Sequence, residues 1–312
     1  GDDLYEHWKV QVDANQDPVR IDKYLADKMA YQSRNRIQQA ADAGFIHVNG
    51  KPVKSNYKVR PNDIVTLMLD RPRHETSIKP EEIDINVVYE DDQLMVVNKK
   101  AGMVVHPGAG NFHGTLIQAV AWHLRDMPEF DANDPEVGLV HRIDKDTSGL
   151  LMIAKNDKAH ESLAAQLKDK TSKRRYLAIV HGEIANDKGT IEAPIGRNLK
   201  DRKKQAVVSG GKPAVTHFEV LERFYGYTLI ALRLETGRTH QIRVHMASIG
   251  HPLVGDEVYG PKKCPFKGLQ GQTLHARTLG IIHPTTGKYL EVNAPLPEYF
   301  IELLDRLRNI CR

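Results

Sequence analysis

The first seventy residues alternate between apolar and polar positions in a way that predicts two short helices followed by strands. Three apolar residues recur at every fourth position and mark one face of the first helix: Ile21, Leu25 and Met29. Ser33 is a suitable N-cap for a second helix, and Gly44 stands where that helix would end. β-Favouring runs follow at 45–48 and 64–69, and the Asn-Gly pair at 49–50 is typical of a tight hairpin turn. The segment therefore predicts the order helix, helix, hairpin, strand.

Beyond residue 80 the pattern changes to many short strands with few helices. Strands are predicted at 87–89, 94–97, 150–154, 176–180, 216–221 and 228–234. Helices are predicted at 114–124, in the segment that Asp157 would cap, and at 297–307. Short turns between the strands and uneven spacing of the helices indicate an α+β fold with a mixed, mostly antiparallel sheet.

This change in pattern divides the chain of 312 residues into parts. The acidic, aperiodic residues 1–15 are predicted to form an N-terminal tail or a loose edge strand. A small α/β domain is predicted at 16–75 and a larger domain at 86–312. The polar run 71–76 leads into a linker that we expect at 76–85.

Hydrophobic residues make up 40% and charged residues 27% of the chain, which is typical of a globular protein. No apolar run approaches the roughly 18–20 residues that span a bilayer, so we expect no association with a membrane. The N-terminal residues lack the basic and apolar regions of a secretory signal. Two cysteines, Cys264 and Cys311, supply neither a disulfide framework nor a metal quartet. We therefore expect a cytoplasmic protein, with a monomer as its simplest state.

Positive charge is unevenly distributed along a chain whose net charge is only +4. Residues 18–60 hold nine Lys/Arg against three Asp/Glu, and the segments 168–175 and 197–204 each hold five against one. Separated basic patches on a nearly neutral chain indicate a polyanion that is contacted at several places. Solubilising surface charge would give the same pattern, so both interpretations are open at this point.

The basic residues of the first domain lie on helix faces opposite the apolar positions, an arrangement suited to contact with a phosphate backbone. The segments 20–25, 33–34 and 48–51 resemble an S4 RNA-binding domain, whose fold packs two helices on a small sheet. The resemblance implies that this S4-like domain binds structured RNA. The RNA-binding residues expected here are Arg20, Lys23, Arg34, Arg36 and Lys51.

The segment 138–150 concentrates polar residues between the apolar pair at 139–140 and a predicted buried strand. Aspartate is rare beside a buried strand unless it is paired or functional, so Asp144 could be a nucleophile, a base or a metal ligand. Asp, Thr, Ser and Gly are also turn-forming residues, and a plain turn explains the same composition. The residues alone leave both interpretations open.

The sequence His-Arg-Ile-Asp-Lys-Asp-Thr-Ser-Gly at 141–149 resembles the signature of the RluA family of pseudouridine synthases. Ile143 stands where the family usually has Leu, which is a mild departure. The resemblance implies a pseudouridine synthase fold, with Asp144 as the catalytic residue. It also implies that Arg142 helps to displace or steady the target nucleotide.

Two further motifs extend the resemblance towards the C-terminus. The segment 173–178 resembles the second family motif, which implies that Tyr176 lies against the target base. The segment 234–245 resembles the third motif, which implies that Arg243 pairs with the catalytic aspartate. Three further residues of these motifs are expected to contribute to RNA binding: His141, Arg238 and His240.

The glycine-containing loop 98–111 and the segment 251–256 also match the family, although Lys100 stands where Pro is frequent. Together with the S4-like domain, these segments most resemble the RluD-type subgroup that acts on large-subunit ribosomal RNA. The implied partner is this RNA, within an assembling ribosomal particle. Two alternatives are a non-catalytic RNA-binding assembly factor on the same scaffold and a synthase that acts on tRNA.

The implied reaction breaks the N1–C1′ bond of uridine, turns the uracil and rejoins it through C5. Positive charge develops at the sugar, and an ionised Asp144, favoured by Arg243 alongside, could stabilise that charge, attack C1′ or remove a sugar proton. The Tyr176 ring could stack on the flipped uracil, and the Arg142 guanidinium could fill the space it leaves. No hydride or phosphate is transferred and no water is consumed, so we expect no cofactor and no metal ion.

Overall fold

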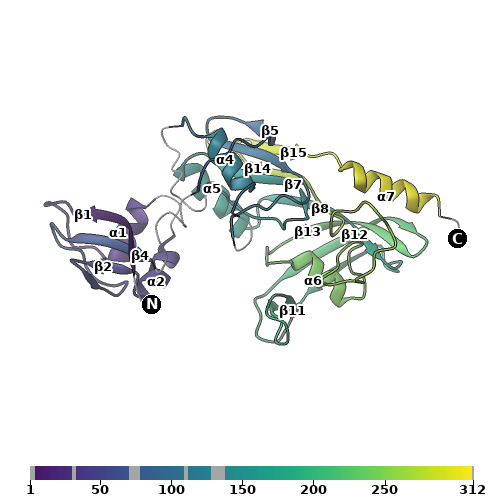
Figure 1. Ribbon diagram of the computed structural model, residues 1–312, viewed down its shortest axis with the longest axis horizontal. Helices are drawn as coiled ribbons and strands as arrows, with labels where there is room; N and C mark the ends of the chain where they lie inside the picture. The colour runs from purple at the N-terminus through teal and green to yellow at the C-terminus, as the bar shows by residue number, and fades with distance from the viewer. Residues whose placement is uncertain (1–3, 30–32, 70–77, 109–111, 128–137, 311–312) are drawn as a thin grey trace. The chain divides into compact units, whose positions relative to one another are not determined.

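The computed structural model describes residues 4–29, 33–69, 78–108, 112–127 and 138–310 (Figure 1). The chain forms two compact units: the first comprises residues 1–80 and 123–138, and the second comprises residues 81–122 and 139–312. The polar run 71–76 lies outside the described residues. The boundaries expected for the tail, the linker and the two domains stay predictions.

The first unit combines two helices with a four-stranded antiparallel sheet. Its helices are α1 (Ile21–Lys28) and α2 (Arg34–Asp42), and its strands are β1 (Tyr5–Gln11), β2 (Ile46–Val48), β3 (Lys51–Pro52) and β4 (Ile64–Leu69). The strand order is β1-β4-β2-β3, and the predicted order of helix, helix, hairpin and strand is confirmed. β1 lies within the range 1–15, where a tail or an edge strand was expected, and it is the edge strand. It pairs with β4 because Trp8 and Val10 share one face and pack against the core.

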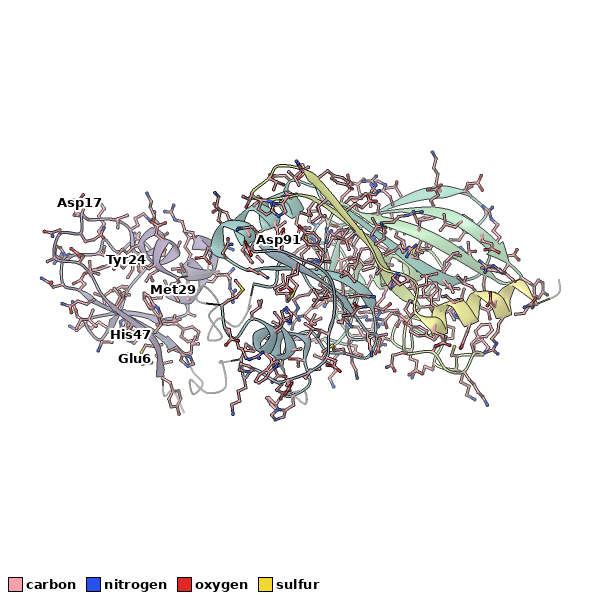
Figure 2. All side chains as sticks on the ribbon, turned by 90° about the horizontal axis from the view of Figure 1, so that it is seen from above. Glu6, Asp17, Tyr24, Met29, His47 and Asp91 are labelled. Carbon is pink, nitrogen blue, oxygen red and sulfur yellow. The ribbon has the colours of Figure 1, made fainter. Side chains whose placement is uncertain are left out.

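Local preferences set the ends of these elements. Ser33 Oγ accepts a hydrogen bond from the amide three residues later at 3.2 Å, so Ser33 caps α2 as predicted. Gly44 (φ 81°) follows α2, and Asn49 (φ 51°) and Gly50 (φ 83°) form the tight turn between β2 and β3. The core between helices and sheet contains Ile21, Tyr24, Leu25, Ile37, Ala41, Ile46 and Val65. Tyr24 is labelled in Figure 2.

A buried carboxylate connects α1 to α2. The Asp22 side chain is fully shielded from solvent and lies 2.8 Å from Gln38 Nε2, 3.0 Å from Arg20 Nη2 and 3.2 Å from Arg34 Nε. Burial alone would raise the pKa of Asp22, but hydrogen bonds from Gln38, Arg20 and Arg34 outweigh it and lower the pKa to about 2. The charged form of Asp22 therefore stabilises the pairing of the two helices.

We expect Asp22→Asn to destabilise the first unit by about 2 kcal/mol at neutral pH. Because the folded-state pKa of Asp22 (about 2) lies below the ordinary value of 3.8, its contribution is fully present above that value and is lost as the pH falls through 2. Urea unfolding as a function of pH, followed by Trp8 fluorescence in a Trp122→Phe background, measures this contribution. The control is Asp27→Asn, an exposed position on the same helix. Equal destabilisation by the two changes would contradict the role of Asp22.

The second unit is built on a nine-stranded sheet with one separate hairpin. The sheet strands are β5 (Asn86–Glu90), β6 (Leu94–Lys99), β7 (Ser148–Ala154), β8 (Lys173–His181), β9 (Lys188–Glu192), β12 (Val215–Phe224), β13 (Tyr227–Leu234), β14 (Leu274–Ile282) and β15 (Tyr289–Asn293), and the hairpin strands are β10 (Ile195–Arg197) and β11 (Gln205–Val207). The order is β5-β6-β7-β14-β8-β13-β12-β9, with β15 paired to β14. Among the described strands only β7 and β14 pair in parallel, so the predicted mixed, mostly antiparallel sheet of an α+β fold is confirmed.

Four helices accompany this sheet: α4 (Leu116–His123), α5 (Asp157–Lys168), α6 (Gln241–Ser248) and α7 (Glu298–Arg308). The predictions of α4, α5 and α7 are confirmed, whereas the apolar pattern does not predict α6. The predicted cap of α5 is wrong by one position, because Asn156 Oδ1, and not Asp157, accepts the Ala159 amide at 2.9 Å. No helix in the described part of the chain is long and apolar enough to cross a membrane.

Different helices cover the two faces of the central strands. On one face, Tyr176 of β8 packs with Leu232 of β13 and Ile242 of α6. On the other face, Leu177 of β8 packs with Phe300 of α7. We call these the α6 face and the α7 face of the sheet. Because side chains alternate along a strand, neighbouring residues of β8 serve opposite faces.

Candidate active site

Asp144 lies in the loop that leads into β7. Its carbonyl oxygen accepts a hydrogen bond from the Thr147 amide at 3.1 Å, and its side chain keeps 28% of its surface exposed. Gly149 (φ 116°) follows in β7, where a Cβ atom would overlap with the Ala276 carbonyl oxygen of β14. The segment is therefore a turn that presents a carboxylate, and close contact with β14 requires the glycine at its end.

Arg243 joins Asp144 to a second carboxylate. Arg243 Nη1 donates to Asp144 Oδ2 at 3.1 Å, while Nε and Nη2 donate to the two oxygens of Asp256 at 2.7 and 3.0 Å. The Arg243 side chain is only 8% exposed and that of Asp256 is fully buried. Burial alone would lower the pKa of Arg243, but Asp256 and then Asp144 outweigh it and raise the pKa. The predicted contact between Arg243 and Asp144 is present, with the guanidinium held in one orientation.

Asp256 is a site residue that sequence reasoning did not single out. Its Oδ1 also accepts the backbone amides of Val258 at 3.0 Å and Tyr259 at 3.2 Å, so its carboxylate is fixed by the loop that follows it. The available signal was the aspartate that ends the family-like segment 251–256, one glycine after the apolar pair at 253–254. A fully buried aspartate needs a charged partner, and here that partner is Arg243.

His240 and Tyr259 complete the surroundings of Asp144. His240 precedes α6 in a left-handed conformation (φ 56°), with Nε2 3.8 Å from Asp144 Oδ1 and Nδ1 2.6 Å from Tyr259 Oη. The Arg243 guanidinium lies 5.0 Å from the centre of the Tyr259 ring. Burial lowers the pKa of His240, although the charge of Asp144 opposes the change. The lowered pKa favours the neutral form of His240 beside Asp144.

Tyr176 lies on the α6 face of β8, in the same packed cluster as Ile143, the residue before Asp144. The residue is 6% exposed. Burial raises the pKa of the Tyr176 hydroxyl, with Arg174 opposing and Asp144 reinforcing the change. The structure thus brings Asp144, Arg243 and Tyr176 to one site, with a neutral phenol beside the two charged groups.

Known proteins identify the family of this chain. A family model described as RNA pseudouridylate synthase matches residues 93–248, and an S4 domain model matches residues 19–65. The chain belongs to the RNA pseudouridylate synthase family. An uncharacterised RNA pseudouridine synthase of Bacillus subtilis is 52% identical to this synthase over 290 residues, or 93% of this chain and 94% of that protein. The ribosomal large subunit pseudouridine synthase D of Pseudomonas aeruginosa is 44% identical over 306 residues, covering 93% and 92%.

Two solved structures share the fold of the synthase. Human RNA pseudouridylate synthase domain containing 4 has a TM-score of 0.57 and 25% identity, covering 72% of this chain and 93% of that protein. Human RNA pseudouridylate synthase domain containing 1 has a TM-score of 0.54 and 28% identity, covering 74% and 97%. The predicted pseudouridine synthase fold is confirmed, and so is the N-terminal S4 domain.

Lys99 of the synthase fixes the turn that carries Asp144. It is 2% exposed, and its Nζ donates to the carbonyl oxygens of Lys100 and Met103 at 2.9 Å and of Lys145 at 2.8 Å. Burial lowers the pKa of Lys99 to about 7, against the opposing charges of Asp146 and Asp144. The three hydrogen bonds join the loop after β6 to the residue directly after Asp144.

The predicted RNA-binding residues of the second unit lie in different environments. Arg142 is exposed beside Asp144, whereas Arg238 is partly buried and donates to the Pro213 carbonyl oxygen at 2.8 Å. His141 Nε2 accepts the Met152 amide at 3.0 Å, and burial lowers the pKa of His141 to about 3. The neutral His141 ring therefore anchors the loop to β7, and its contact with RNA stays a prediction.

The predicted RNA-binding residues of the first unit are exposed cations. Arg20 and Arg34 keep 44% and 48% of their side-chain surface exposed although both pair with Asp22. Three further cations are exposed: Lys23, Arg36 and Lys51. Nothing in their geometry tests RNA binding directly, so this role stays a prediction.

The site offers a charged carboxylate, a fixed guanidinium and a neutral phenol. Among the described residues, no group of three or more His, Cys, Asp or Glu side chains is arranged to hold a metal ion. The chemistry that these residues can perform is stabilisation of positive charge and transfer of protons, with an aromatic ring available for a planar base.

Proposed function

We propose that this synthase isomerises specific uridines of large-subunit ribosomal RNA to pseudouridine, with Asp144 as the catalytic residue. The observation that carries the proposal is the clamp in which buried Asp256 orients Arg243 and Arg243 orients Asp144. Relatives with the printed name ribosomal large subunit pseudouridine synthase D match over 90% of this chain at 41–44% identity and support the choice of RNA. We further propose that the enzyme acts as a monomer on an assembling ribosomal particle in the cytoplasm.

Each step of the reaction has a candidate group in the site. As the N1–C1′ bond breaks, positive charge develops on the ribose, and the Asp144 carboxylate stabilises it, attacks C1′ or removes a sugar proton. The uracil turns against the Tyr176 ring and rejoins C1′ through C5. C5 then loses its proton and N1 gains one, so the product is an isomer of the substrate. The Tyr176 hydroxyl, neutral at the start, is placed to take part in this proton transfer.

A basic hairpin supports the approach of RNA to this site. The connection between β10 and β11 carries the cationic segment 197–204, and Leu199 at its tip is 90% exposed. Where the connection enters β11, the Gln205 amide donates to Tyr259 Oη at 2.9 Å, and Tyr259 contacts His240 beside Asp144. Lys204, the last cation of the segment, therefore directly precedes a residue that Tyr259 and His240 connect to Asp144.

The test is release of tritium from large-subunit ribosomal RNA that carries 5-tritiated uridine, followed by mapping of the modified positions. We expect release from this RNA and none from tRNA assayed in parallel. If tritium were released from tRNA and not from ribosomal RNA, the substrate would be tRNA and the proposed substrate would be wrong. Absence of release from both RNAs, with RNA binding intact, would favour a non-catalytic assembly factor.

The exposed lysines of the S4 domain are expected to contribute affinity and not chemistry. We expect the double change Lys23→Gln and Lys51→Gln to weaken RNA binding and to lower the slope of log affinity against log salt by about 0.7–0.9 for each lost phosphate contact. Binding titrations over a salt series measure both quantities. The control is Lys158→Gln, an exposed lysine on α5 of the second unit. An unchanged salt slope in the double variant would show that these two lysines do not contact RNA.

A further inference from the structure

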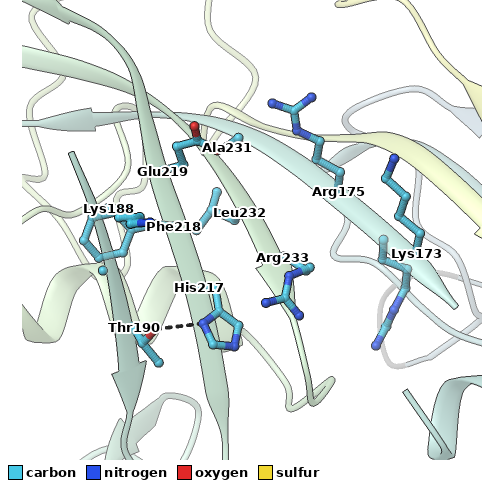
Figure 3. A pocket seen from close by; sticks show the side chains of 12 residues that line it. Lys173, Arg175, Lys188, Thr190, His217, Phe218, Glu219, Ala231, Leu232 and Arg233 are labelled. Carbon is cyan, nitrogen blue, oxygen red and sulfur yellow. Dashed lines mark hydrogen bonds between the residues drawn. The ribbon is translucent and has the colours of Figure 1, made fainter. Parts of the chain in front are cut away.

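A row of polar side chains crosses four strands on the α7 face of the sheet. Arg175 of β8 is the register partner of Arg233 of β13, which is the register partner of His217 of β12, which pairs in turn with Thr190 of β9. These residues line a pocket of about 460 Å³ (Figure 3). His217 Nδ1 lies 2.8 Å from Thr190 Oγ1, so the end of the row nearest the sheet edge is already ordered.

This row lies on the opposite side of the sheet from Asp144. Tyr176 directly follows Arg175, and Leu232 directly precedes Arg233. Tyr176 and Leu232 are buried on the α6 face, in the cluster against which Ile143 packs. Side chains alternate along strands, so Arg175 and Arg233 point away from the catalytic cluster. Both are exposed. We call the row with its pocket the reverse-face surface.

The two arginines of the reverse-face surface have no ion-pair partner within the described part of the protein, whereas His217 Nε2 lies 3.3 Å from Glu235 Oε2. No hydrogen bond or ion pair there involves the Arg175 or Arg233 guanidinium, although the two residues stand directly opposite each other. Like charges on directly opposed strand positions are destabilising. Of the twelve described residues that line the pocket, only Glu219 is acidic. Lys188 adds further positive charge, whereas Lys173 pairs with Glu291 at 3.0 Å. An unpaired arginine pair of this kind indicates an anionic partner.

We propose that the reverse-face surface binds backbone phosphates of the substrate RNA, at a segment other than the one that enters the Asp144 site. This inference rests on the proposed RNA substrate. Guanidinium groups bind phosphate oxygens through paired hydrogen bonds, and the Thr190 hydroxyl is a further potential donor. Strands lie about 4.8 Å apart, so the row from Arg175 to Thr190 spans about 14 Å. That length fits successive phosphates of a nucleic acid strand better than a single small anion.

The test is RNA binding by the double variant Arg175→Gln and Arg233→Gln. We expect weaker binding and a salt slope lower by about 0.7–0.9 per lost contact, thus by about 1.4–1.8 in total. The loss should appear with long ribosomal RNA and not with a short stem-loop that carries only the mapped uridine. Glu219→Gln, which removes the acidic group of the pocket, should strengthen binding of the long RNA. The matched control, Lys158→Gln with Lys288→Gln, removes two exposed positive charges elsewhere and should keep the parental slope.

Each outcome decides the proposal. An unchanged salt slope for the double arginine variant, with tritium release by the parent intact, would overturn the reverse-face surface and leave the proposed function standing. If the arginine and lysine double variants lost RNA affinity equally, the loss would reflect overall charge, and the proposed reverse-face surface would also be overturned. Titration with inorganic phosphate distinguishes a site for RNA phosphates from a site for a free small anion. Loss of phosphate binding without loss of RNA affinity would make this a small-anion site.

Discussion

Asp144→Asn is expected to lower the single-turnover rate of pseudouridine formation by several orders of magnitude while RNA affinity stays close to that of the parent. The amide nearly keeps the shape of the carboxylate but removes the negative charge that opposes the positive charge developing on the ribose. Such a charge acts on the transition state far more than on the bound ground state. Tritium release with enzyme in excess over RNA measures the rate, and binding titration measures the affinity.

A close neighbour provides the control for this change. Asp146 lies in the same turn, where its Oδ1 accepts a hydrogen bond from Gln270 Nε2 at 3.1 Å. Asp146→Asn therefore makes the same chemical change two residues away from the proposed catalytic group, and we expect a much smaller loss of rate. Substantial turnover by pure Asp144→Asn protein would exclude Asp144 as the catalytic residue.

Arg243→Lys is expected to fold, to bind RNA nearly as well as the parent and to turn over at least about a hundredfold more slowly. The guanidinium uses Nε and Nη2 on Asp256 and Nη1 on Asp144, which lies on the other side of the group. A lysine keeps the charge but has a single nitrogen, so it cannot hold both carboxylates in this geometry. Asp144 would lose its fixed orientation, and the single-turnover rate would report the loss.

Two further variants separate position from charge. Arg202→Lys, in the cationic segment 197–204, should change neither rate nor affinity strongly, because only charge is needed there. Asp256→Asn leaves Arg243 and Asp144 unchanged but weakens the support of the guanidinium, so its rate should fall in the same direction as that of Arg243→Lys. If Arg243→Lys matched the parent in single-turnover rate, the positioning role of Arg243 would be wrong even though the family is established.

Much of the first unit could be predicted from local sequence, because its determinants are local. Ile21 and Leu25 follow the helical period, Ser33 caps α2, and the Asn-Gly pair at 49–50 closes a hairpin; all three act within a few residues. The N-terminal strand β1 was harder to predict, since its pairing partner β4 lies more than fifty residues away. The alternation of Trp8 and Val10 indicates a strand only when the pairing with β4 is known.

Site residues that belong to a sequence motif could be predicted, whereas those brought to the site by tertiary contacts could not. Asp144, Tyr176 and Arg243 belong to three recognisable motifs, and the structure places them together. Asp256 ends the family-like segment 251–256 and Tyr259 follows it, but neither position reveals the distant residues that it contacts in the fold. β14 was not predicted either, because it is buried within the sheet and mixes polar residues such as His275 and Thr278 among its apolar ones. His275 is satisfied by Ser148 of β7 at 2.7 Å, a partner that sequence order does not reveal.

The position of β14 between β7 and β8 has a consequence for folding of the enzyme during its synthesis. The turn that carries Asp144 leads into β7, and Tyr176 lies on β8. These two strands are not neighbours, because β14 lies between them and pairs with both. β14 is synthesised about a hundred residues after β8. A nascent chain that ends before residue 274 therefore has every signature residue but no scaffold to hold them in register. Strand pairs so distant in sequence also form slowly. Catalytic competence should thus appear late and abruptly during synthesis, when β14 has left the exit tunnel.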